Sequence, residues 1–344
     1  MQPSRMLVLG FSIIILTGAT LLFLPISSKS GQFSSFIDCL FTATSATCVT
    51  GITVLDTFNY FNGFGQGVIL ALIQVGGLGF LTLVTFINLI LGKKLGWSTV
   101  KIAASDLTDN ALETTPKRLF YEIVLYSFAI EFVGAVIHAF VFVPDFGALG
   151  VFEAIFLSVS AFCNAGFDVL ADTDVGGSLC RYATDPVVNF TIMALIIIGG
   201  LGFAVWGDIR HNRRFSRMSV YTRLVIIITT VLIFGGAGIF AALEWNNPGT
   251  LGGLTPPQKL MAALFQSVTL RTAGFATFDQ NALSDVSKAV ADFLMLIGGS
   301  SGSTAGGVKT VTVGVILFAA WSTARGRTSV QIMKRRIPQQ AVAN

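Results

Sequence analysis

A loop that closes with glycine occurs three times in this chain, and it constrains the fold more than any other feature. The copies are Thr47–Gly51, Phe162–Gly166 and Leu270–Gly274, and each closes a short apolar segment rich in Ser and Thr. A long hydrophobic stretch that contains a pair of glycines follows each copy. A repeat of about 110 residues indicates one structural unit that is copied around an axis.

The composition excludes an ordinary water-soluble domain. Hydrophobic residues make up 53% of the chain and charged residues only 12%, whereas soluble domains carry about 25% charged residues. Of the 22 Lys and Arg residues, 16 lie in four places outside the apolar stretches: Arg5, Lys93–Arg118, Arg210–Arg223 and Arg325–Arg336. This distribution follows the positive-inside rule of membrane proteins. It does not give the continuous basic face that a nucleic-acid-binding domain needs, so no nucleic-acid partner is expected.

Two lengths of apolar stretch alternate along the chain. About 20 apolar residues span a bilayer core, and runs of about 10 to 14 are typical of re-entrant segments. The long stretches are Met6–Ile26, Phe64–Leu91, Leu119–Val143, Val187–Trp206, Leu224–Leu243 and Ala289–Trp321. The short ones are Phe33–Ala46, Val151–Phe162 and Pro256–Leu270. The order long, short, long predicts six spans, three segments that re-enter from the outer side, and a cytoplasmic N-terminus.

The glycine loops have the chemistry of a cation filter. Backbone carbonyls can replace the water shell of an alkali cation, because they are dipoles without net charge. A final glycine permits positive φ, so successive carbonyls can turn toward an axis. The residues before the glycine differ among the copies, as expected if the backbone binds the ion. One such loop alone would favour a helix-packing turn, but three copies in matched contexts favour an ion pore.

Two acidic residues lie near the starts of the short segments. Asp38 and Glu153 each precede their loop glycine by 13 residues, which predicts a position in the first turn of a pore helix. A carboxylate at that position complements the helix dipole, and it can also gather cations at an outer mouth. The first interpretation is favoured, and Met261 in the third segment would leave a ring of charge incomplete.

The last long stretch, Ala289–Trp321, is 33 residues long and is interrupted by glycines. Its middle, Gly298–Gly307, holds five glycines and four Ser or Thr residues. Each glycine disfavours a helix by about 1 kcal/mol relative to alanine, and non-helical backbone at membrane depth is tolerated only where it faces protein or water. We therefore expect a movable gate below the filter, with a structural kink as the alternative.

These loops, together with the motifs Gly76–Phe80, Gly199–Phe203 and Gly298–Gly307, resemble the Trk/Ktr/HKT superfamily of potassium transporters over essentially the whole chain. The resemblance is greatest to the bacterial KtrB membrane subunits. It implies an all-α polytopic membrane protein, in which repeated M1-P-M2 units (helix, re-entrant pore loop, helix) surround a potassium-channel-like pore. It also implies a bacterial inner-membrane location, K+ and possibly Na+ as the transported ions, and a homodimer. A KtrA-like cytosolic ring would carry the nucleotide, so no cofactor is expected on this chain.

The functional residues of the family carry over by motif. The filter would consist of Cys48, Val49, Thr50, Gly51, Cys163, Asn164, Ala165, Gly166, Arg271, Thr272, Ala273 and Gly274. The gating loop would consist of Gly298, Gly299, Ser300, Ser301, Gly302, Ser303, Thr304, Ala305, Gly306, Gly307 and Lys309. Lys309 would either extend to the cytosolic side among lipid headgroups or hold the loop across the cation path. Selectivity for potassium rests on the resemblance, because no copy carries a complete TVGYG motif.

The chain departs from the family pattern at its end. Three repeats are expected at 1–100, 101–217 and 218–337, with 338–344 as the start of a linker to a fourth repeat. Because the chain stops at Asn344, we expect it to be part of a longer protein. The third loop is also predicted to be one residue shorter than the others between its helix and its glycine.

An intramembrane serine protease is the rival function, because residues 299–302 match a Gly-x-Ser-Gly motif. Its chemistry needs a base within hydrogen-bond reach of the serine, and both histidines, His138 and His211, precede the motif. The sequence therefore favours a transporter over an enzyme.

His138 also follows Glu131 by seven residues in the third long stretch. We expect these two to form a hydrogen-bonded pair that faces the bundle interior, in preference to a proton relay.

Overall fold

The structure is a computed structural model, and it describes residues 3–79, 116–170, 177–325, 331–332 and 335–336. Most of the predicted linker at 92–117 lies outside the described residues, as do Phe80 and everything after residue 336.

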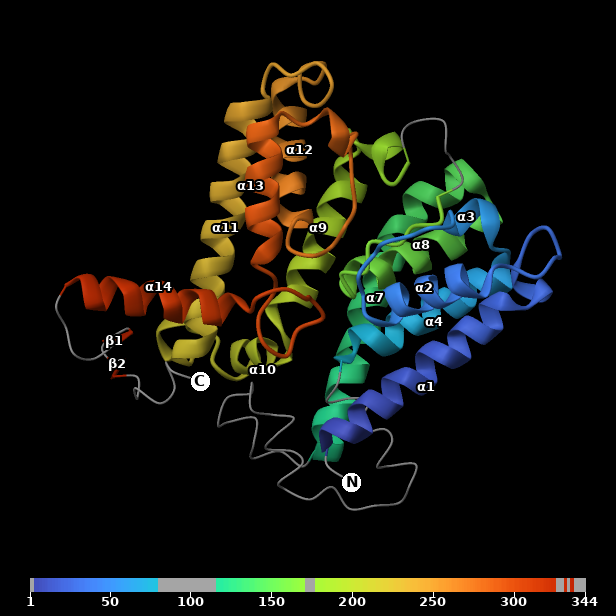
Figure 1. Cartoon of the computed structure of the whole chain (residues 1–344). Coiled ribbons are helices and arrows are strands. Elements are labelled where there is room, and N and C mark those ends of the chain that lie inside the picture. The colour runs from blue at the N-terminus through green and yellow to red at the C-terminus, as the bar shows by residue number, and fades with distance from the viewer. Residues whose placement is uncertain (1–2, 80–115, 171–176, 326–330, 333–334, 337–344) are drawn as a thin grey trace.

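Figure 1 shows a helical molecule in which one pattern occurs three times: a long helix, a short helix, a loop and a further helix. The first repeat contains α1 (Pro3–Phe23), η1 (Pro25–Ser27), α2 (Phe36–Thr47), α3 (Thr57–Tyr60) and α4 (Gly63–Gly77). The second contains α7 (Pro116–Phe146), α8 (Ala148–Phe162), η3 (Cys180–Tyr182), α9 (Pro186–Leu201), α10 (Phe203–His211) and η4 (Phe215–Arg217). The third contains α11 (Val220–Glu244), α12 (Pro256–Thr269), η5 (Gln280–Ala282), α13 (Asp285–Leu296) and α14 (Thr310–Ala324). A short antiparallel pair follows, β1 (Gln331–Ile332) with β2 (Arg335–Arg336).

Equivalent polar residues fix where the helix after each loop begins. The side chains of Asn62, Asp185 and Ser284 accept hydrogen bonds of 2.8 to 3.4 Å from backbone N–H groups in the first turns of α4, α9 and α13. These N–H groups have no partner within the helix, so an N-cap side chain satisfies them. The three repeats therefore share a start signal for this helix as well as the order of their elements.

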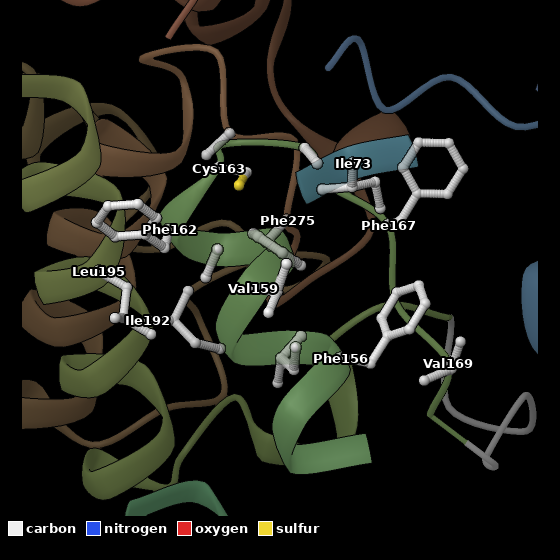
Figure 2. Close-up of a cluster of buried hydrophobic side chains, with 14 of the residues drawn as sticks. Ile73, Phe156, Val159, Phe162, Cys163, Phe167, Val169, Ile192, Leu195 and Phe275 are labelled. Atoms are coloured by element: carbon white, nitrogen blue, oxygen red, sulfur yellow. The ribbon is translucent and has the colours of Figure 1, made fainter. Parts of the chain in front are cut away.

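Buried apolar side chains from all three repeats meet around α8 (Figure 2). The labelled residues include Phe156, Val159 and Phe162 of α8, Ile192 and Leu195 of α9, Ile73 of α4, and Phe275 from the third repeat. Each fully buried Phe or Ile contributes about 1.5–3 kcal/mol of hydrophobic free energy. The second short helix is therefore enclosed by protein on several sides, and it holds the second glycine loop in a fixed place.

The predicted spans lie only partly within the described residues, because the stretch Phe64–Leu91 is described no further than Gly79. Within the described residues, two helices are long and apolar enough to cross a membrane: Phe120–Phe146 and Val220–Glu244. A third crossing exists only as a broken pair, because α9 and α10 bend by 92° at Gly202. The predicted span over Val187–Trp206 is therefore either a broken span or a re-entrant loop. Gly202 has a φ of 88°, which residues with a side chain rarely adopt, so the α-helix ends there.

The acidic residues of the short helices do not form a matched pair. Asp38 lies in the first turn of α2, as predicted. Glu153 does not lie in the first turn of α8, because that helix begins five residues earlier at Ala148. Its side chain is fully buried. The prediction that Glu153 occupies a first helical turn is therefore wrong, and its burial contradicts a role in gathering cations at an outer mouth.

Candidate ion-conducting site

The three glycine loops share one backbone conformation. Their glycines, Gly51, Gly166 and Gly274, have φ values of 78°, 70° and 87°. The residue two positions earlier also has positive φ in every loop: 55° at Val49, 57° at Asn164 and 65° at Thr272. A residue with a side chain in this region costs about 1–3 kcal/mol and persists only where its surroundings impose it. The repeated sequence motif therefore corresponds to a repeated backbone geometry.

Hydrogen bonds from the preceding helix impose this conformation. The N–H of Thr50 donates to the Ser45 carbonyl, and the N–H of Ala165 donates to the Ser160 carbonyl, both at 2.8 Å. Bonds of this span are typical of a helix that ends in a left-handed residue. In these two loops, the bond reaches the residue just before the glycine, so it links the helix end directly to the glycine loop.

The third loop has an extra residue between its helix and its glycine. Its corresponding bond runs from the Gly274 N–H itself to the Thr269 carbonyl, at 3.4 Å. The helix α12 ends at Thr269, five positions before the glycine, whereas α2 ends at Thr47, four positions before Gly51. The prediction that the third loop is one residue shorter is therefore wrong, and the loop is one residue longer. It still brings Thr272 and Gly274 into the shared conformation.

The loops lie against one another through their backbones. A Cβ atom on Gly51 would lie 2.5 Å from the carbonyl oxygen of Ala165, and one on Gly166 would lie 2.6 Å from that of Ala273. Contacts of less than 3.0 Å force a neighbouring backbone to move. The first loop is therefore beside the second and the second beside the third, with glycine required at each contact.

The glycine pairs of the following helices allow a second close approach. A Cβ atom on Gly76 would lie 2.0 Å from the carbonyl oxygen of Thr47, and one on Gly199 would lie 2.0 Å from that of Phe162. Thr47 and Phe162 are the last residues of the short helices α2 and α8. In the first two repeats, the glycine pairs therefore let the second long helix pack directly against the base of the loop.

Side chains of the predicted filter residues differ from loop to loop. Cys163 and Asn164 are buried, whereas Cys48 is exposed. Arg271 is buried, and one terminal nitrogen of its guanidinium donates weak hydrogen bonds to the Gly298 carbonyl and the Thr310 hydroxyl, at 3.4 and 3.5 Å. The feature common to all three loops is therefore the course of the backbone, not a side chain.

An acidic residue follows the second loop closely. The pKa of the Asp168 carboxyl is raised to about 6, mainly by burial and also by the negative charge of Asp56, while hydrogen bonds from the Leu170 backbone and Ser178 oppose the rise. Since the pKa is raised, the negative charge of Asp168 is lost as the pH falls through about 6. The potential beside the second loop is therefore less negative in acid.

The long third-repeat stretch is interrupted as predicted. The helix α13 ends at Leu296 and α14 begins at Thr310, and Figure 1 shows that α14 does not continue along the line of α13. At the base of the intervening segment, the N–H of Gly298 donates to the Val308 carbonyl at 3.1 Å, and the N–H of Val308 donates to the Leu296 carbonyl at 3.0 Å. The predicted gating loop is thus a closed loop with a narrow neck.

The predicted gating loop contacts two of the glycine loops. The hydroxyl of Thr304 donates to the Phe162 carbonyl at 2.9 Å, at the base of the second loop. The N–H of Gly306 donates to the hydroxyl of Thr272 in the third loop at 3.1 Å. Lys309 donates from Nζ to the Ala305 carbonyl at 2.9 Å, so its amine binds the loop itself. Hydrogen bonds therefore connect the predicted gating loop to two of the three predicted filter loops.

The expected pairing of Glu131 with His138 is not formed. Both residues are buried, but Glu131 accepts its hydrogen bond from Gln74 of α4, with 3.0 Å between Nε2 and Oε1. The imidazole of His138 stacks on the ring of Phe142. Sequence reasoning missed Gln74, although a polar side chain inside a hydrophobic stretch was a visible signal. The contact joins the first repeat to the second behind Cys163, whose sulfur lies 4.0 Å from Glu131 Oε1.

Comparison with known proteins identifies the family. The model of the TrkH family, described as "Cation transport protein", matches residues 4–344. This chain belongs to the TrkH family. Its relatives include the potassium/sodium uptake protein NtpJ of Enterococcus hirae, which is 40% identical over 99% of this chain and 74% of its own length. They also include the Ktr system potassium uptake protein B of Bacillus subtilis, which is 42% identical over 97% of this chain and 74% of its own length.

A solved structure shows the same fold. The potassium transporter TrkH of Vibrio parahaemolyticus superposes with a TM-score of 0.69 at 22% identity, over 97% of this chain and 66% of that protein. The predicted fold class, an all-α polytopic membrane protein built from repeated pore-loop units, is therefore confirmed. The chain spans about three quarters of the length of these two curated relatives.

The serine protease interpretation finds no support. The family is one of transporters. Tyr221 donates from its hydroxyl to the carbonyl of Ser301, and the Ser300 hydroxyl donates to the Leu201 carbonyl. Among the described residues, no hydrogen bond joins a histidine to either serine. The polar groups of this segment therefore serve to hold the segment in place.

Proposed function

We propose that this chain forms the greater part of a potassium pore. The filter consists of the backbone of Cys48–Gly51, Cys163–Gly166 and Arg271–Gly274, and Gly298–Gly307 with Lys309 forms the gate. The observation that carries this proposal is the shared conformation of the three glycine loops, in contact backbone to backbone. Carbonyls arranged in this way can replace the hydration shell of a cation without adding a fixed charge.

The choice of potassium draws on the relatives. NtpJ is named a potassium/sodium uptake protein, and the Bacillus subtilis relative is named a potassium uptake protein. We infer that K+ is the ion transported by the protein of which this chain is part, and that Na+ is a second candidate ion. The ion is the cargo, and no bound cofactor is needed on this chain.

Uptake by the full-length protein tests this proposal. When it is produced in a bacterial strain that lacks its own potassium uptake, we expect growth at low external potassium and influx of 86Rb+. Excess K+ should suppress that influx at least about tenfold more effectively than Na+, because the filter is expected to fit the larger ion. Vector-only cells provide the control. Influx of 22Na+ with no influx of 86Rb+ would contradict the proposal.

We also propose the placement of the chain in the membrane. The repeats occupy 1–100, 101–217 and 218–337, residues 338–344 begin a linker to a fourth repeat, and the N-terminus is cytoplasmic in the inner membrane. Two observations favour this placement. The basic clusters lie outside the apolar stretches, as the positive-inside rule requires, and the start of α1 lies toward the same side of the molecule as α10 (Figure 1).

The assembly is proposed to be a homodimer on a cytosolic, KtrA-like ring of nucleotide-binding subunits. The relative from Bacillus subtilis is named as part of a Ktr system, and the basic segment Arg325–Arg336 offers charge to an acidic partner. The competing acceptor for this segment is anionic lipid.

Pull-down with variants of this segment separates the two acceptors. We expect the full-length protein to co-purify with a soluble ring protein, and the double variant Arg335→Gln, Arg336→Gln to retain less than about half of it, because two charged contacts are lost. The pair Arg213→Gln, Arg214→Gln is a control of equal charge. Loss of binding to anionic vesicles, with the ring still bound, would assign the segment to lipid.

A further inference from the structure

The break between α9 and α10 leaves backbone groups without their helical partners. In an unbroken helix, the carbonyl of Gly199 would accept from the N–H of Phe203. Here that N–H donates instead to the carbonyl of Gly302, at 3.0 Å. Gly202 has a φ of 88°, and it separates two helices that meet at 92°. The second repeat therefore has a short row of backbone groups that are not paired within α9 or α10.

The gating loop supplies partners for this row. The N–H of Thr304 donates to the Gly199 carbonyl at 3.3 Å, and the N–H of Ser300 donates to the Gly200 carbonyl at 3.0 Å. The hydroxyl of Ser300 donates to the carbonyl of Leu201. Each of three successive carbonyls at the end of α9 is thus paired with a donor from the loop.

A side chain from the third repeat adds to this docking. The hydroxyl of Tyr221, in the first turn of α11, donates to the carbonyl of Ser301 at 2.9 Å. Together with the Phe203–Gly302 bond, it satisfies two successive carbonyls of the loop. Residues 300–304 therefore exchange hydrogen bonds with the broken helix in both directions, and Tyr221 holds them from the neighbouring helix.

Such reciprocal pairing has a physical cause. Non-helical backbone at membrane depth must find protein or water as its partner, because lipid offers none. Two interrupted helices, one in the second repeat and one in the third, can satisfy each other. The loop cannot leave this position without exposing the carbonyls of Gly199 to Leu201, so the position is stabilised by the whole set of bonds.

We propose that the break at Gly199–Phe203 is the docking site that holds the gating loop in its closed position, and that Gly202 and Tyr221 are the positioning residues of this site. The inference rests on the proposed role of the loop as a gate. It assigns the hold on the gate to the second repeat, which lies outside the gating loop itself. Disturbing the docking site should therefore release the loop and leave the filter intact.

Two variants weaken the docking site in different ways. A Cβ atom on Gly202 would lie 2.6 Å from Ser300 Oγ and 3.0 Å from the Ser301 carbonyl oxygen, so Gly202→Ala must displace the loop. Gly207→Ala is the matched control, because a Cβ atom there meets nothing within 4 Å. Tyr221→Phe removes one hydrogen bond with little change of shape, and it tests the proposal if Gly202→Ala fails to fold.

Two measurements on the full-length protein, hydrogen–deuterium exchange and 86Rb+ influx, test whether the docking site holds the loop closed. Hydrogen–deuterium exchange of the 297–309 segment should become about fivefold faster or more in Gly202→Ala and Tyr221→Phe, as the loss of one hydrogen bond predicts, and 86Rb+ influx should rise by a similar factor. Gly207→Ala should match the wild type in both, and the K+/Na+ preference should not change in any variant. Unchanged exchange in both docking variants would overturn the proposal, and so would faster exchange with unchanged influx.

A loop-shortened variant separates this inference from the proposed gate. If shortening the loop raises influx while the docking variants do not, the loop is a gate and the docking site does not hold it closed. If shortening the loop leaves influx unchanged, the gate itself is wrong and the docking inference falls with it.

Discussion

Gly166→Asp is expected to lower potassium uptake by the full-length protein at least about 30-fold. A residue with a side chain at this φ of 70° costs about 1–2 kcal/mol. The added Cβ would also lie 2.6 Å from the carbonyl oxygen of Ala273 and 3.1 Å from the Cα of Gly274. The third loop must therefore move, and a carboxylate enters a ring of carbonyl dipoles. The measurement is 86Rb+ influx at matched surface expression.

Gly147→Asp is the control for this variant. Gly147 has a similar φ of 62°, but a Cβ atom there meets nothing within 4 Å. It therefore carries the conformational cost without the clash, and we expect uptake within about twofold of the wild type. Gly51→Asp should behave like Gly166→Asp, because its Cβ would lie 2.5 Å from the Ala165 carbonyl oxygen. Normal uptake in both filter variants would remove these glycines from the filter.

Deleting Ser301–Ala305 is expected to raise potassium influx about tenfold and to weaken its dependence on a regulatory partner. The deletion removes three of the five docking hydrogen bonds, those made by Ser301, Gly302 and Thr304, and leaves the two made by Ser300. The neck of the loop should survive, because Gly298 and Gly306 already lie in contact at the base of the loop, where a Cβ atom on Gly298 would be 1.8 Å from the Gly306 carbonyl oxygen. A gate that has lost its closed position should remain open.

Ion selectivity shows whether the deletion acts on a gate or on the filter. The three glycine loops remain intact, so the ratio of 86Rb+ to 22Na+ influx should change less than about twofold. Ser303→Ala, which removes two hydrogen bonds internal to the loop, should leave influx near the wild-type value. A deletion that altered the ion preference and left influx and regulation unchanged would assign the loop to the filter.

The repeated elements of this fold could be predicted from the sequence because their signals are local. The glycines at 51, 166 and 274 recur in matched contexts, and all three have the positive φ that glycine permits. The interruption of the last long stretch was equally visible, since five glycines lie within it. In both cases, the residue type itself restricts the backbone, so no knowledge of distant contacts was needed.

Other features depend on contacts between distant residues, which the pattern within one segment does not specify. Gly79 and Gly202 occupy the same place in their motifs and both have positive φ, but the motif does not show that residues 300–304 of another repeat stabilise the bend at Gly202. Glu153 was assigned to a first turn because its spacing from the glycine equals that of Asp38, but α8 begins five residues before it. Glu131 found its partner in Gln74 of another helix, which periodicity within one helix cannot reveal.

The pairing between the two broken helices has a consequence for how the protein is made. The Leu201 carbonyl receives its hydrogen bond from a residue 99 positions later in the chain. A ribosome delivers the second repeat to the membrane well before that residue has been synthesised. Until then, lipid cannot provide hydrogen-bond donors for the carbonyls at the end of α9. We therefore expect α9 to leave the insertion machinery unbroken or to remain sheltered within it, and to acquire its bend only when the third repeat arrives.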